Sequence, residues 1–235
     1  MKKRFSIVIF ILFSSWCYGQ NAEYYYSEGE KKSFFRDFNS AIYNYNIAIE
    51  MKSNYTLAYI GRGSAKEELK DYANAISDFT KALEIDPDNT NAYFRRGVTK
   101  TKMQDYIGSI TDYTKAILID PINDRIYYNR GYSKAELEDF RGAIADYNKA
   151  IEINPENGQA YYNRAFSKTK IKDFRGAILD NTKAIEIDNQ NSEAYLNRGI
   201  VYITIGMKNE GCIDLSKAGE LGNRTAYDAI KELCN

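Results

Sequence analysis

A fixed interval of 34 residues runs through this chain and constrains its fold more than any other feature of the sequence. Gly131 recurs as glycine at Gly97, Gly63 and Gly29, and Ala150 also recurs upstream and downstream at the same step. No insertion breaks the register. A unit of this length is too small to bury its own apolar face, so the period predicts a stack of repeats that share one continuous core.

Each repeat is expected to hold two helices. In the 90–123 segment, Tyr93 and Gly97 stand at helical spacing in the first half, and the Asp105-Tyr106 pair is expected to open a second helix. The prolines mark the ends of second helices, because proline cannot continue a helical hydrogen-bond ladder. The predicted repeats are 22–55, 56–89, 90–123, 124–157, 158–191 and 192–225, followed by a covering helix over 226–235.

Small residues recur inside the predicted helices. Gly63 and Gly131 lie in first helices, and Ala75 and Ala143 lie in second helices. Glycine within a helix costs about 1 kcal/mol relative to alanine, so its recurrence indicates that two helices approach closely there.

The repeat pattern resembles that of the tetratricopeptide repeat family. The residues that carry the resemblance are Tyr93, Tyr127, Gly97, Gly131, Ala143, Tyr147, Ala150 and Pro155. The resemblance implies an all-α fold, a right-handed superhelical α-solenoid of about six helix-turn-helix repeats with a C-terminal covering helix. It also implies a concave groove, lined by first helices, that binds an extended peptide or a partner helix, and it implies no catalytic chemistry.

The amino-acid composition argues against several classes of function. The 32 basic and 32 acidic residues balance, which gives no electrostatic footprint for nucleic acid. Histidine is absent and only three cysteines are present, so the commonest general base and metal ligand are missing. We expect no enzyme activity, no metal, no cofactor and no small-molecule substrate.

The amino terminus has the features of an export signal. Lys2, Lys3 and Arg4 precede the apolar run Phe5 to Phe13, which is too short to cross a bilayer. We expect a secretory signal peptide at 1–19, a repeat array over 20–225, and a periplasmic or extracellular location that includes association with the envelope. An uncut anchor and lipidation at Cys17 are the alternatives.

Two charged columns repeat in phase. They are expected to form a structural charge ladder in which each arginine fork pairs with an aspartate on a neighbouring helix. The alternative is that the arginines recruit an acidic ligand. The columns are Arg62, Arg96, Arg130, Arg164 and Arg198, with Asp78, Asp112, Asp146, Asp180 and Asp214.

A second set of residues is expected to face the groove, because helical spacing places its members on one side of successive first helices. Asn129, Asn163 and Asn197 would form an asparagine ladder that holds a peptide backbone, or would solvate the surface or bond to the next repeat. The complete set is Phe94, Arg95, Arg125, Tyr128, Asn129, Tyr132, Tyr162, Asn163, Phe166 and Asn197.

Cys212 and Cys234 remain once the leader is removed. They are interpreted either as a disulfide that holds the C-terminal helix or as two small core residues.

The sequence therefore predicts a non-catalytic scaffold that binds a protein or peptide partner. The alternative is a structural or assembly component of the cell envelope that self-associates through its open first repeat.

Overall fold

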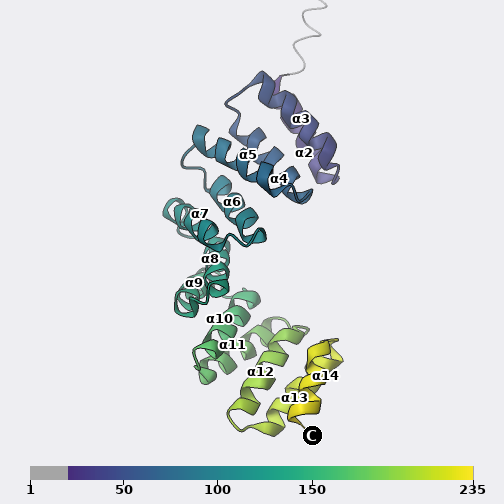
Figure 1. The fold of residues 1–235 in the computed structure, drawn as a ribbon, viewed down its shortest axis with the longest axis vertical. Helices are drawn as coiled ribbons and strands as arrows, with labels where there is room; N and C mark the ends of the chain where they lie inside the picture. Colours follow the sequence, from purple (N-terminus) through teal and green to yellow (C-terminus); the bar gives the residue numbers. More distant parts are fainter. Residues whose placement is uncertain (1–20, 235) are drawn as a thin grey trace, which may run out of the picture. The chain divides into compact units, whose positions relative to one another are not determined.

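A computed structural model describes residues 21–234, which form helices joined by short turns, with no strand in that range (Figure 1). The expected all-α fold is confirmed for this part of the chain. The predicted signal peptide at 1–19, with Cys17, lies outside the described residues.

Helices alternate along the chain as first and second members of successive pairs. The first helices begin at the predicted repeat starts, because an asparagine side chain caps most of them. These are α2 (Ala22–Phe34), α4 (Thr56–Glu68), α6 (Thr90–Lys102), α8 (Asp124–Glu136), α10 (Gly158–Lys170) and α12 (Ser192–Thr204). The second helices are α3 (Phe38–Met51), α5 (Tyr72–Ile85), α7 (Tyr106–Ile119), α9 (Phe140–Ile153), α11 (Phe174–Ile187) and α13 (Lys208–Glu220).

The covering helix α14 (Arg224–Leu233) begins two residues before the expected start at 226. Asn223 fixes this start, since its side-chain oxygen accepts a hydrogen bond from the Ala226 amide at 3.3 Å. Tyr227 Oη donates to the carbonyl oxygen of Gly219 at 3.0 Å. A disulfide joins Cys212 on α13 to Cys234, with the two Cα atoms 5.8 Å apart. This helix is therefore tied to the last pair by packing and by a covalent bond.

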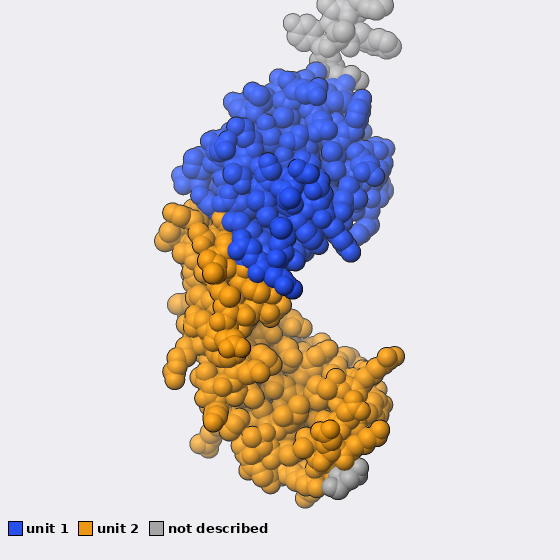
Figure 2. Space-filling model, in the orientation of Figure 1, with its two compact units in different colours: residues 1–105 blue, residues 106–235 orange. Residues whose placement is uncertain are grey.

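The chain divides into two compact units. The first runs to Asp105 and contains α2 to α6, and the second starts at Tyr106 and contains α7 to α14 (Figure 2). The third predicted repeat, 90–123, is thus divided between the two units. Each unit is described below by itself.

One kind of turn links the two helices of a pair. After α8, Glu138 adopts a left-handed conformation with φ of 60°, and the Asp139 amide donates back to the carbonyl of Lys134 at 2.9 Å. The Asp139 side chain then accepts from the Gly142 amide at 2.9 Å and caps α9. The same residue therefore closes one helix and opens the next. Left-handed residues recur at Arg36, Lys70, Gln104 and Lys172, and only the last pair uses a glycine, Gly206, there.

Aromatic rings fill the space between the helices of a pair. Tyr147 on α9 is fully buried, and a Cβ atom placed on Gly131 of α8 would lie 2.9 Å from its ring. Phe79 stands in the same relation to Gly63, at 2.8 Å. The close approach expected at these glycines is confirmed, and its cause is a ring on the second helix that leaves no room for a side chain.

Candidate functional site

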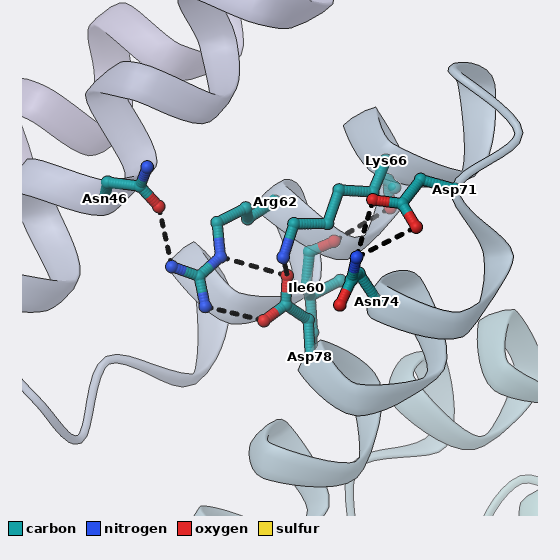
Figure 3. Close-up of polar contacts among 8 residues, drawn as sticks. Asn46, Ile60, Arg62, Lys66, Asp71, Asn74 and Asp78 are labelled. Carbon is teal, nitrogen blue, oxygen red and sulfur yellow. Dashed lines mark hydrogen bonds and ion pairs between the residues drawn. The ribbon is translucent and has the colours of Figure 1, made fainter.

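The predicted charge ladder consists of arginines that bridge three helices. Arg62 on α4 donates from Nε and Nη2 to the Asp78 carboxylate on α5, at 2.9 and 2.6 Å. Its Nη1 donates to Asn46 Oδ1 on α3 at 2.7 Å, and Lys66 Nζ lies 2.8 Å from Asp78 Oδ2 (Figure 3). One guanidinium thus joins its own pair of helices to the pair before it.

The second unit repeats this arrangement. Each arginine donates twice to the aspartate 16 residues later and once to a polar side chain 16 residues earlier. The pairs are Arg130 with Asp146 and Thr114, Arg164 with Asp180 and Asn148, and Arg198 with Asp214 and Thr182. The hydrogen bonding of Arg198 to the carboxylate of Asp214, which accepts, raises the pKa of Arg198. The remaining pair of the ladder, Arg96 and Asp112, is divided between the units, and within the first unit Arg96 Nη1 donates to Thr80 Oγ1 at 3.0 Å.

These arginines are fully engaged inside the protein. The side chains of Arg62, Arg130, Arg164 and Arg198 are 15 to 18% exposed, and each guanidinium also lies over the ring of the tyrosine three residues earlier, 5.3 Å from its centroid for Tyr59. A planar fork that already bonds through three nitrogens has little capacity left for an acidic ligand. The contacts favour the structural interpretation of the column.

The residues expected to face one groove are divided between the two units. Phe94 and Arg95 lie on α6 in the first unit, whereas the others lie on α8, α10 and α12 in the second. The candidate site is therefore the first-helix face of the second unit.

A cavity of about 200 Å³ opens on this face. Aromatic rings from three helices dominate its lining, and Tyr132 and Phe166 at its mouth are 37% and 40% exposed. The lining residues are Tyr132, Ala135 and Glu136 of α8, Tyr147 of α9, and Tyr162, Asn163 and Phe166 of α10. Four of them, Tyr132, Tyr162, Asn163 and Phe166, belong to the set expected from the sequence.

One residue of the cavity lining, Ala135, is small. Two repeats earlier, the position of Ala135 is held by Glu67, which is buried and ion-paired with Lys102 at 2.5 Å. Glu67 also accepts a hydrogen bond from Thr99 at 3.1 Å. In the first unit, the ion pair of Glu67 with Lys102 therefore occupies the position that Ala135 holds beside the cavity in the second unit.

The cavity is lined by neutral rings with opposite charges at its rim. Burial raises the pKa of Tyr147 and Tyr162, and burial together with Glu136 raises the pKa of Tyr132, so these phenols stay protonated. Glu136 accepts from Tyr106 Oη at 3.1 Å, and Lys170 Nζ lies 5.0 Å from the centre of the Phe166 ring. Such a site suits an apolar side chain flanked by polar backbone better than it suits an ion.

The three asparagines of the expected ladder are not equivalent. Asn129 donates from Nδ2 to the backbone oxygen of Arg125 in its own helix, at 2.7 Å. Asn163 donates to Tyr128 Oη of the preceding repeat at 3.0 Å, whereas the buried Nδ2 of Asn197 has no hydrogen-bond partner. The amides of Asn129 and Asn163 therefore form hydrogen bonds within the protein, which was the alternative interpretation. They do not form a uniform ladder for the backbone of a bound peptide.

Sequence reasoning missed three lining residues, Ala135, Glu136 and Tyr147. Tyr147 belongs to the column of second-helix aromatics with Tyr45 and Phe79, and that column was the available signal. For Ala135 the signal was its difference from Glu67 at the equivalent position.

Residues 21–234 contain no cluster of His, Cys, Asp or Glu suited to a metal ion. In the same range, no helix has both the length and the apolar character needed to span a membrane.

Comparisons with known proteins agree on the kind of repeat. Family models of the tetratricopeptide repeat match residues 56–89, 90–123 and 125–157. A search of curated proteins finds no match.

Several solved structures share the fold. The crystal structure of MamA is 25% identical and superposes with a TM-score of 0.67, covering 70% of this chain and 96% of its own. YrrB, a tetratricopeptide repeat protein described as having an unusual peptide-binding site, is 20% identical with a TM-score of 0.71, covering 80% of this chain and 98% of its own. PilF of Pseudomonas aeruginosa is 14% identical with a TM-score of 0.77, covering 90% and 96%.

Proposed function

Because this chain belongs to the tetratricopeptide repeat family, whose members are mainly interaction scaffolds, we propose that it binds an extended protein segment on the first-helix face of its second unit. The segment places an apolar or aromatic side chain in the cavity between α8 and α10. No catalytic step is part of this function.

The observation that carries the proposal is the aromatic cavity itself. It combines partly exposed rings at the mouth, Tyr132 and Phe166, with the buried ring of Tyr147. Aromatic side chains with few rotatable bonds supply large contact area at low entropic cost, which is why they dominate binding energy at protein interfaces. The mixed rim of Glu136 and Lys170 gives no preference for a charged partner, so selectivity is expected to rest on shape and apolar burial.

Selection from a phage library of random dodecapeptides on the chain that follows the leader tests this function. We expect enriched peptides to share an apolar anchor and to bind Phe166→Ala at least about tenfold more weakly, since truncation of an interface hot spot costs about 2 kcal/mol or more. Leu118→Ala is the matched control, since Leu118 is 74% exposed on α7 of the same unit and is not one of the residues that line the cavity. Equal losses in both variants, or no loss in either, would refute the proposal.

Self-association is a second candidate, and one observation favours it. Phe34 and Phe35, at the turn between α2 and α3, are 82% and 77% exposed. Two large rings left in water suit contact with another surface, and a second copy is the simplest partner. Sedimentation equilibrium is expected to show concentration-dependent mass that Phe34→Ser abolishes, and a monomer at all concentrations excludes this candidate.

We also propose that the protein is exported. The Cys212–Cys234 disulfide supports this, because such bonds persist in oxidising compartments outside the cytoplasm. Mass determination of the protein from envelope and medium fractions tests whether residues 1–19 have been removed, and an intact leader on all of the protein contradicts cleavage.

A further inference from the structure

The fifth repeat breaks the packing pattern of the four pairs before it. Where second helices carry a large ring, such as Tyr45, Phe79 and Tyr147, α11 carries Asn181, which is fully buried. At the facing position, where first helices have glycine, α10 carries Ala165. The extra methyl group replaces only part of the volume that the smaller second-helix side chain gives up, and the exchange leaves an amide in place of a ring.

This amide is unsatisfied. Neither Nδ2 nor Oδ1 of Asn181 has a hydrogen-bond partner, and the buried Nδ2 of Asn197 on α12 also lacks one. Among residues 21–234, buried side-chain nitrogen and oxygen atoms without a partner occur only at these two residues. Buried polar groups are nearly always bonded, so unpartnered amides in two successive repeats indicate a position that something else completes.

The two asparagines occupy positions that already define a site one repeat earlier. Tyr147 and Asn163 line the same cavity between α8 and α10, and the residues 34 positions later are Asn181 and Asn197. Phe166 belongs to both positions. It lines the mouth of the cavity, and in the next repeat it takes the place that Tyr132 has at the cavity. The repeat therefore places both unpartnered amides one step further along the second unit, at the positions that correspond to Tyr147 and Asn163.

The geometry points to a second subsite here, and we propose that Asn181 and Asn197 bind the carboxamide side chain of a glutamine or asparagine in the bound segment. This rests on the proposed peptide-binding function and specifies its ligand. A primary amide complements the unpartnered atoms, since its oxygen accepts from an Asn181 or Asn197 Nδ2 and its NH₂ group donates to Asn181 Oδ1. Asn181 lies on the second helix α11 and is fully buried, so the proposal requires the ligand's side chain, and not its backbone, to enter between the helices.

The spacing within the ligand follows from the spacing of the repeats. Neighbouring packed helices lie roughly 10 Å apart, and an extended chain advances about 3.3 to 3.6 Å per residue. The carboxamide is therefore expected about three residues from the apolar side chain that fills the aromatic cavity.

The test uses the dodecapeptides selected on the wild-type chain. We expect glutamine or asparagine to be enriched about three residues from the apolar anchor. Asn181→Leu should bind a selected glutamine peptide about tenfold more weakly than wild type does, and should no longer prefer it to the same peptide with leucine in place of glutamine. Leucine is chosen because Leu215 occupies the equivalent position in the next repeat.

Two further variants separate binding from folding. Asn197→Ser removes the second amide, which lies outside the core. This variant should show the same loss of preference for the glutamine peptide, whether or not Asn181→Leu folds. Asn129→Ser is the matched control, because its amide is already bonded to the Arg125 backbone oxygen, and it should keep wild-type affinity.

The outcomes also separate the subsite from the proposed function. The subsite alone is overturned if the selected peptides bind Phe166→Ala more weakly than wild type but show no preference for a carboxamide. In that outcome they also bind Asn181→Leu and Asn197→Ser as tightly as wild type. If no peptide is selected, or if Phe166→Ala has no effect, the proposed function and the subsite fail together.

Discussion

Replacing Asp146 by alanine should destabilise the second unit more than any surface change of the same size. Asp146 Oδ2 accepts from Arg130 Nε at 2.9 Å, and Oδ1 accepts from Arg130 Nη2 at 2.6 Å. Lys134 Nζ lies 2.8 Å from Oδ2 as well. Its side chain is 4% exposed, against 16% for Arg130 and 21% for Lys134. The substitution therefore leaves two partly buried cations facing each other without their anion.

The expected cost is about 3 kcal/mol. Removing one partner of a buried ion pair typically costs 3 to 5 kcal/mol, and the lower end applies because both cations keep some contact with water. Replacing Arg130 as well, in Arg130→Met with Asp146→Leu, removes the stranded guanidinium and should recover at least half of the loss.

Urea denaturation followed by far-ultraviolet circular dichroism measures these changes. Glu152→Ala is the control on the same helix, since its pair with Lys149 is 67% and 54% exposed and is expected to contribute less than about 0.5 kcal/mol. A loss below about 1 kcal/mol for Asp146→Ala, or one equal to that of Glu152→Ala, would refute the reasoning that the ladder holds the helices together.

Three further predictions concern stability. Reducing the Cys212–Cys234 disulfide, which closes a loop of 22 residues, should lower the unfolding free energy of the C-terminal helices by about 3 kcal/mol, and an unchanged urea midpoint in dithiothreitol contradicts this. Glu138→Gly should raise stability by about 0.5 to 1 kcal/mol because glycine adopts the φ of 60° without strain, and Gly206→Ala, at φ of 88°, should lower it. Burial, Glu30 and Tyr55 raise the pKa of Tyr26 to about 12, and burial also raises the pKa of Tyr147, whereas unfolded tyrosine ionises near pH 10. The stability that these raised pKa values contribute is complete below about pH 10 and is lost as the pH rises toward the folded values, so the urea midpoint should fall between about pH 10 and pH 12.

The period of the sequence predicted where helices begin and end. The starts at Ala22 and Thr90, the turn at Asp139 and the stop before Pro155 follow from capping and proline chemistry, which act over a few residues. The left-handed residues were not predicted, because Glu138 and Lys70 have no side-chain signature for that conformation. Local signals therefore sufficed for the helices and not for every turn.

The site was predictable only in part, because equivalent positions have different neighbours. Asn129, Asn163 and Asn197 share one place in the repeat, yet the first bonds its own helix, the second a tyrosine of the preceding repeat, and the third has no partner for its Nδ2. These outcomes depend on side chains that vary between repeats. The contact from each arginine to the preceding second helix was missed for a similar reason, since it depends on how successive pairs stack.

Photocrosslinking tests most directly whether the aromatic cavity is the binding site. With p-benzoylphenylalanine at position 166, a peptide selected on the wild-type chain should crosslink, and the modified peptide residue should be its apolar anchor or a neighbour. The same group at position 118, on α7, should give no crosslink above background. Equal crosslinking at both positions, or crosslinking at 118 alone, would contradict the account.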